Sequence, residues 1–164
     1  RVLPTFKYRL SKVDESSRTR LLAFLARVAE WQEPMNAEDE DSMLDVLGID
    51  EGELAFASAA SRIPDAWLIS GDKNFIVALG KDARCREVAE RLQGRVVCFE
   101  HVLSRLIASL GFERIREVVV PMRSIDGTLR SAFGSGEATT QVNALDALRA
   151  FAPRPQVPLL IPWE

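Results

Sequence analysis

Two short apolar runs, "AWLIS" at residues 66–70 and "RVVCFE" at residues 95–100, constrain the fold of this chain more than any other feature. Neither run alternates polar and apolar residues, which is the pattern of strands that are covered on both faces of a parallel sheet. Helical patterns at 72–79, 83–93 and 101–110 separate and follow these runs. Strand, helix, helix, strand and helix in this order predict an open α/β sheet with right-handed crossovers.

Helical patterns also lie before and after this central region. Apolar residues at helical spacing predict a helix over 16–33 that ends at Pro34, and shorter helices over 37–47 and 50–61. Beyond Gly111, residues 125–133 and 137–151 have helical patterns, whereas residues 114–120 fit a helix or a strand. We therefore expect an α/β domain over residues 1–111 and a helical extension over residues 112–164 with a Pro-rich, extended tail.

Charge and composition exclude several classes of protein. The net charge of −3, with eight acidic and no basic residues over 38–53, is unlike that of a protein that coats nucleic acid. This acidic run fits either a solvated face or a local pocket for a divalent metal ion. No apolar run reaches the ~20 residues that a membrane helix needs. The start lacks a signal-peptide pattern, and the two cysteines lack metal-site spacing, so we expect a cytoplasmic protein with reduced thiols.

Two acidic residues are candidates for a functional site. Asp72 follows the first predicted strand by two residues, and ligands of open α/β sheets bind beyond the carboxyl ends of the strands. Glu53 lies near the start of the preceding helix, which can share that edge, and paired carboxylates suit Mg²⁺ or Mn²⁺. A structural alternative stays open for both residues. Asp50 and Glu53 have the spacing of a capping box, and Asp72 is a natural N-cap for the helix that follows.

The segments "DEGELAFASAASRIPDAWLISGDKNFIVAL" and "GRVVCFEHVLSRL" resemble the second half of a PIN-like nuclease domain, over about residues 50–107. The resemblance implies a Rossmann-like, mostly parallel sheet flanked by helices, and a cluster of acids that binds Mg²⁺ or Mn²⁺ and cleaves RNA. Glu53 matches the helix acid of the family, and Asp72 matches the acid of its motif after the strand. The family's first strand and its acid have no counterpart before Leu3, and Asn74 stands where a further acid often occurs.

These observations predict a metal-dependent endoribonuclease with Asp72, Glu53 and Asn74 in its catalytic site. Lys73 and Arg62 flank the two acids and are expected to contact RNA phosphates. The alternative is a non-catalytic module of the same type that binds RNA or a protein partner, and Asn74 and the missing first acid favour it. The protein partner would be an antitoxin-like chain, as in a toxin–antitoxin pair, or a second copy of this chain. No membrane contact is expected.

Other kinds of site have little support in the sequence. There is no Walker-type phosphate loop and no G-x-S-x-G motif, and the single histidine, His101, is expected to be a structural residue at a helix start. Trp67 is expected in the core. The tail carries Leu159, Leu160, Ile161 and Trp163 between prolines that forbid a helix, and burial of such side chains is favourable. We therefore expect the tail to pack on its own domain, with Trp163 holding it there.

Overall fold

The computed structural model describes residues 14–27, 36–43 and 45–163 of the chain. Contacts divide the chain into two compact units, Arg1–Met35 and Asn36–Glu164. In the first unit, helix α2 spans Glu15–Leu25, and the Asp14 side chain accepts a hydrogen bond from the Ser17 amide at its start. The helix expected near residue 16 is therefore confirmed. The helix ends at Leu25 with Ala26 as its C-cap, so the expected extent to residue 33 is wrong. Residues 28–33 and Pro34 lie outside the described residues.

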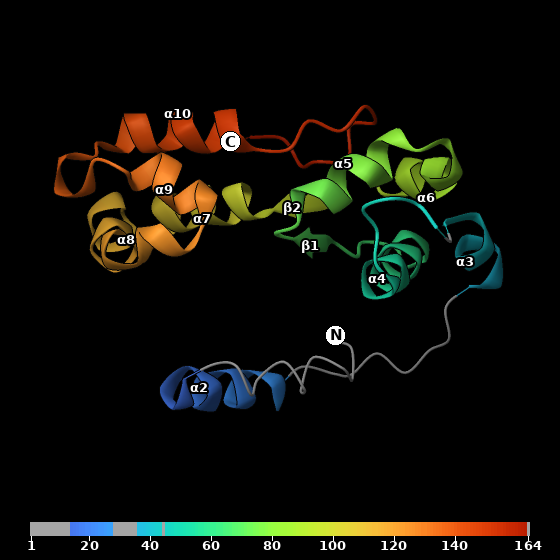
Figure 1. Ribbon diagram of the computed structural model, residues 1–164, viewed down its shortest axis with the longest axis horizontal. Helices are drawn as coiled ribbons and strands as arrows, with labels where there is room; N and C mark the ends of the chain where they lie inside the picture. The colour runs from blue at the N-terminus through green and yellow to red at the C-terminus, as the bar shows by residue number, and fades with distance from the viewer. Residues whose placement is uncertain (1–13, 28–35, 44, 164) are drawn as a thin grey trace. The chain divides into compact units, whose positions relative to one another are not determined.

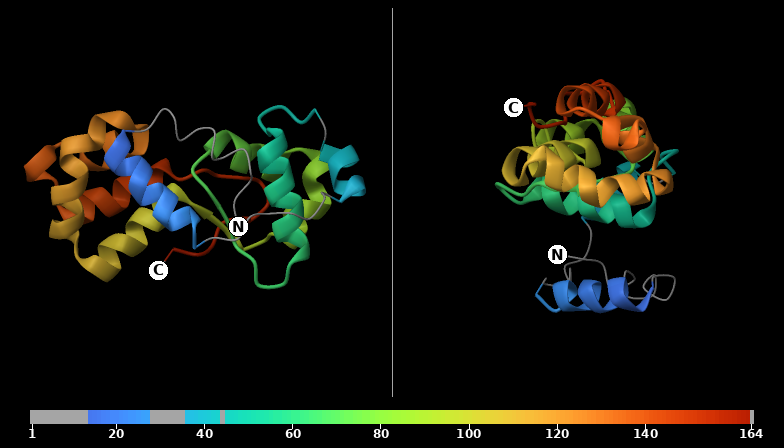
Figure 2. Two further views of the ribbon diagram at one scale, coloured as in Figure 1. Left: turned by 90° about the horizontal axis from the view of Figure 1, so that it is seen from below. Right: turned by 90° about the vertical axis from the view of Figure 1, so that its left-hand side faces the viewer.

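The second unit contains the other helices and both strands. In chain order they are α3 (Ala37–Met43), α4 (Glu51–Arg62), β1 (Leu68–Ser70), α5 (Lys73–Lys81), η2 (Ala83–Cys85), α6 (Arg86–Arg91), β2 (Val96–Cys98), α7 (Phe99–Leu110), α8 (Phe112–Val119), η3 (Val120–Ile125), α9 (Gly127–Phe133), η4 (Gly136–Ala138) and α10 (Gln141–Phe151). The strands lie between α3–α6 at one end of this unit and α7–α10 at the other (Figures 1 and 2).

The expected Rossmann-like sheet is wrong for the part of the chain that the structure describes. The unit is mostly helical, and its sheet consists of β1 and β2 alone, paired in parallel with Leu68 opposite Val96 and Ser70 opposite Cys98. Each strand has only three residues. The second apolar run does not form a longer strand, because it continues into α7 at Phe99. The first run is also not covered on both faces, since the Ile69 side chain is 67% exposed.

The Pro-rich tail packs on its own unit, as the sequence predicts. The Val96 amide donates a hydrogen bond to the Leu159 carbonyl, and the Ile161 amide donates one to the Val96 carbonyl, both at 3.0 Å. Leu159 and Ile161 are buried, and the Trp163 ring stacks on His101 with ring centroids 4.0 Å apart. The tail therefore extends the β2 edge, and Trp163 holds it there as expected. The expectation of a core position for Trp67 is wrong, because that side chain is 54% exposed.

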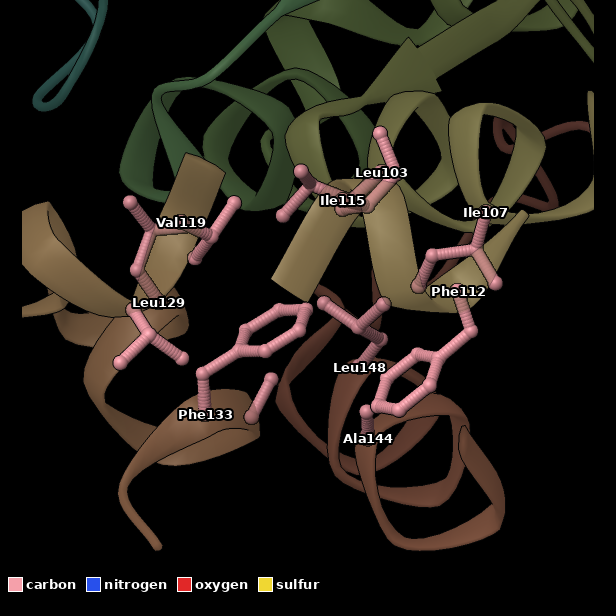
Figure 3. Close-up of a cluster of buried hydrophobic side chains, with 11 residues drawn as sticks. Leu103, Ile107, Phe112, Ile115, Val119, Leu129, Phe133, Ala144 and Leu148 are labelled. Carbon is pink, nitrogen blue, oxygen red and sulfur yellow. The ribbon is translucent and has the colours of Figure 1, made fainter. Parts of the chain in front are cut away.

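Helices α7 to α10 share one hydrophobic core (Figure 3). The side chains labelled in the figure are Leu103, Ile107, Phe112, Ile115, Val119, Leu129, Phe133, Ala144 and Leu148. The rings of Phe112 and Phe133 are stacked within it, 6.3 Å apart. Residues 112–164 are thus helical before the tail, as expected. Because α7 contributes to the same core, the expected boundary at residue 111 falls inside the second unit.

Candidate functional site

The carboxyl ends of β1 and β2 place three polar side chains at one edge of the sheet. Ser70 pairs with Cys98, so Asp72 and Glu100 both follow the last paired residue of their strand by two positions. Helices α5 and α7 begin at this edge, and Lys73 is the first residue of α5. This is the edge at which the sequence predicts a ligand.

Asp72 is the N-cap of α5. Its Oδ1 atom accepts hydrogen bonds from the amides of Asn74, at 2.8 Å, and Phe75, at 3.1 Å. The capping interpretation of Asp72 is therefore confirmed. These bonds use one of the two carboxylate oxygens, and the side chain is exposed, as is that of Asn74.

Glu53 belongs to a capping box at the start of α4. Its Oε2 atom accepts a hydrogen bond from the Asp50 amide at 3.0 Å, and Asp50 Oδ1 accepts one from the Glu53 amide at 2.8 Å. Burial raises the pKa of Glu53. The Asp50 amide acts in the opposite direction, and the negative charges of Asp50 and Asp72 raise the pKa further. Glu53 therefore caps its own helix, and the charge of Asp72 is the smallest of the causes that act on its pKa.

The chemistry of Glu53 and Asp72 fits a hard divalent cation. Each capping arrangement uses one carboxylate oxygen and leaves the other outside these bonds. Carboxylate oxygens suit Mg²⁺ and Mn²⁺, and Mg²⁺ commonly binds through one or two carboxylates and retains several waters. Over residues 14–27, 36–43 and 45–163, no group of three or more His, Cys, Asp or Glu side chains is arranged to hold a metal ion. The fit is therefore to a site with two protein carboxylates.

Lys73 points into the protein from the first turn of α5. Its Nζ atom lies 2.6 Å from Glu100 Oε1 and donates a hydrogen bond to the Phe151 carbonyl, also at 2.6 Å. The same atom lies 4.0 Å from the centroid of the Phe151 ring. The contact with RNA phosphates expected for Lys73 thus competes with three contacts inside the protein.

Glu100 is a residue of this edge that the sequence analysis did not select. Its side chain is fully buried, and Thr128 Oγ1 donates a hydrogen bond to Oε1 at 2.7 Å. Burial acts to raise the pKa of Glu100, but hydrogen bonds from Lys73, Thr128 and Cys98 outweigh burial and lower it. Its Oε2 atom has no hydrogen-bond partner. The signal in the sequence is its position after the second strand, which matches that of Asp72 after the first.

Arg62, the other expected RNA contact, is the last residue of α4 and belongs to an ion-pair network at that end of the helix. Asp39 is buried, and its Oδ2 accepts hydrogen bonds from Arg62 Nε at 2.8 Å and Ser58 Oγ at 2.7 Å. Arg91 Nη2 donates to Oδ1 of the same carboxylate at 2.8 Å. This network joins α3, α4 and α6, so one acid of the 38–53 run is structural.

His101 and Cys98 are buried side by side beneath this edge. His101 Nδ1 lies 2.9 Å from Cys98 Sγ, and burial lowers the pKa of His101. Burial also raises the pKa of Cys98 to about 12, which keeps the thiol protonated and unreactive. His101 lies in the first turn of α7, as the sequence predicts for a structural residue.

A separate depression of about 640 Å³ lies between the α7–α8 turn and the start of α10. Arg116 lines it, but its guanidinium group pairs with Glu113 and donates to the Thr139 carbonyl.

No helix in the described part of the chain is both long and apolar enough to cross a membrane.

Comparisons with protein families, with curated proteins and with solved structures find no match for this chain. The resemblance to PIN-like nucleases therefore stays a prediction from the sequence.

Proposed function

We propose that this chain is a divalent-metal-dependent endoribonuclease of the PIN-like type, with Glu53 and Asp72 as metal ligands. The observation that supports it is that Glu53 and Asp72 each use one carboxylate oxygen in a helix cap and leave the other outside these bonds. The negative charge of Asp72 is also the smallest of the causes that act on the pKa of Glu53. A bound Mg²⁺ or Mn²⁺ ion would supply an activated water and neutralise charge on the scissile phosphate. Each acid is oriented locally, because Asp72 caps α5 and Glu53 belongs to the capping box of α4.

Each residue of the proposed site has a distinct role. Glu53 and Asp72 would hold the ion, and each has one carboxylate oxygen outside its helix cap. The exposed side chain of Asn74 orients water or a phosphate oxygen through its amide group. Lys73 and Arg62 are paired with Glu100 and Asp39, which argues against a main part for either in RNA binding.

A second candidate is a non-catalytic module that binds RNA or a protein partner. The observation that favours it is the number of acids, because no group of three or more His, Cys, Asp or Glu side chains among the described residues is arranged to hold a metal ion. A two-carboxylate site binds Mg²⁺ more weakly than one with three or four acids, since affinity increases with ligand charge.

Calorimetric titration with Mn²⁺, followed by an RNA cleavage assay, separates the two candidates. We expect Mn²⁺ binding by the wild-type chain, and loss of binding in Asp72→Asn and Glu53→Gln. Asp82→Asn is the matched control, because Asp82 caps the turn that follows α5 and pairs with Arg84, away from the proposed site. Mn²⁺-dependent cleavage of single-stranded RNA that chelator abolishes supports the nuclease. Metal binding without cleavage supports the binding module, and absence of metal binding refutes the nuclease.

A further inference from the structure

The first turn of α5 is attached to distant parts of the chain through one side chain. Lys73 follows the cap residue Asp72 directly, and its Nζ atom pairs with Glu100 of α7 at 2.6 Å. The same ammonium group donates to the carbonyl of Phe151, the last residue of α10, and lies over the ring of that residue. Each contact joins α5 to a helix of the C-terminal group.

We infer that Lys73 is a positioning residue, which holds the Asp72 carboxylate in place through its ion pair with Glu100. The inference rests on the proposed function, because it takes Asp72 to be a metal ligand. It changes the role of Lys73 from a contact with RNA to a support for the site.

The burial of Glu100 makes this ion pair a strong constraint. Glu100 has no exposed surface, so water cannot replace Lys73 as its partner at the surface. Thr128 Oγ1 holds the same Oε1 atom at 2.7 Å, and this bond fixes the carboxylate against α9. A buried carboxylate held in this way fixes the ammonium group, and with it the first turn of α5.

The position of Asp72 depends on that of Lys73, because the two residues are consecutive in the chain. Its Oδ1 atom caps the amides of Asn74 and Phe75, so the carboxylate can keep its orientation only while the first turn of α5 keeps its own. Groups that orient metal ligands commonly change metal affinity when they are removed. The helices α9 and α10 thereby support the proposed site, although none of their side chains is proposed to touch the ion.

The test compares Lys73→Met with Lys81→Met, which removes the charge of an exposed lysine at the other end of α5. Hydrogen exchange of the Asn74 and Phe75 amides is measured in the metal-free protein, with the Leu79 amide as an internal reference. We expect exchange at these two amides to become about tenfold faster or more in Lys73→Met, with little change at Leu79. Mn²⁺ affinity should fall by about 10–100-fold. Lys81→Met should change neither quantity.

The double variant Lys73→Met/Glu100→Gln guards against a failure to fold, because it leaves no buried charge without a partner. It should keep the faster exchange at Asn74 and Phe75, since the link to α7 is still broken. Unchanged exchange at both amides in a folded variant refutes the inference, as does an equal increase along the whole of α5. A loss of RNA affinity with unchanged cap amides also refutes it, and assigns Lys73 to RNA binding.

Failure of the proposed function has a different signature. If the wild-type chain binds no Mn²⁺, the metal site is refuted, while the exchange of the two capped amides still decides whether Lys73 positions Asp72.

Discussion

The replacement of Gly80 by alanine tests how closely the tail is packed on α5. Gly80 is a buried residue of this helix, and its carbonyl accepts a hydrogen bond from the Val157 amide of the tail at 3.1 Å. A Cβ atom at Gly80 would lie 2.5 Å from Cβ of Pro155 and 3.2 Å from Cδ1 of Leu159. Gly80→Ala therefore forces the tail to move, or α5 to shift beneath it.

Two opposing effects set the size of the change. Alanine favours a helix over glycine by about 0.8–1 kcal/mol. Overpacking a well-filled site costs about 1–3 kcal/mol. Rotation of the Pro155 side chain cannot relieve the contact, because the backbone Cα atom of Pro155 also lies 3.4 Å from the new Cβ atom. We expect a net loss of up to about 2 kcal/mol, which lowers the melting temperature by up to about 8 °C for a chain of this size.

The measurement is thermal and urea denaturation of Gly80→Ala beside the control Gly127→Ala. Gly127 begins α9, and a Cβ atom there would meet only the Phe151 ring, at an ordinary distance of 3.8 Å. The control should be as stable as wild type, or more stable by up to about 1 kcal/mol. If Gly80→Ala matches the control, the tail does not pack on α5 as described.

Three further predictions concern burial and titration. Glu53→Gln keeps a capping-box partner and removes a carboxyl group with a raised pKa, so the variant should not lose the stability that wild type loses as the pH rises above 4.5. Urea denaturation from pH 4 to 7 measures this, and the same pH dependence of stability in both proteins would contradict it. His101 has a lowered pKa, so wild type should lose stability as the pH falls below 6.5. Stability plotted against pH should fall less steeply in His101→Gln, and equal slopes in the two proteins would show that His101 is not responsible. Leu159→Ala should cost about 2–5 kcal/mol because Leu159 is fully buried, whereas Leu47→Ala, at a side chain that is 93% exposed, should leave the melting temperature unchanged.

Local features of the fold could be predicted from the sequence because they depend on residues a few positions apart. The caps at Asp50 and Asp72 and the start of α5 are confirmed. Gly111 has a φ angle of 87°, a conformation in which glycine has no steric penalty, and it ends α7 as expected. The expected end of the preceding helix at residue 47 is wrong, because α3 ends at Met43.

The extent of the sheet could not be predicted, because it depends on pairing between distant segments. A run such as 66–70 has the composition of a buried strand whether or not partners exist on both sides, and here β1 pairs only with β2 among the described strands. Ile69 and Trp67 are exposed for that reason. The short runs therefore indicated strands correctly but gave no information on how many strands surround them.

The candidate site shows the same division between local and distant information. Asp72 and Glu53 were selected from their positions relative to a strand and a helix start, and the caps that those positions predict are confirmed. The contacts of Lys73 were not predictable, because its partners Glu100 and Phe151 lie 27 and 78 positions further along the chain. A basic residue beside a candidate acid looks like a phosphate contact until its own partner is known.

The confirmed caps do not decide between a structural and a metal-binding role for Asp72, because the two roles use different properties of the same side chain. The cap needs one oxygen that accepts hydrogen bonds from Asn74 and Phe75. The metal site needs negative charge and the other oxygen. Asparagine caps a helix about as well as aspartate but carries no charge, whereas alanine removes both properties at a typical cost of about 1 kcal/mol in stability. Asp72→Asn is thus the substitution that separates them: a residue that only caps tolerates it, and a metal ligand loses the ion while the fold stays intact.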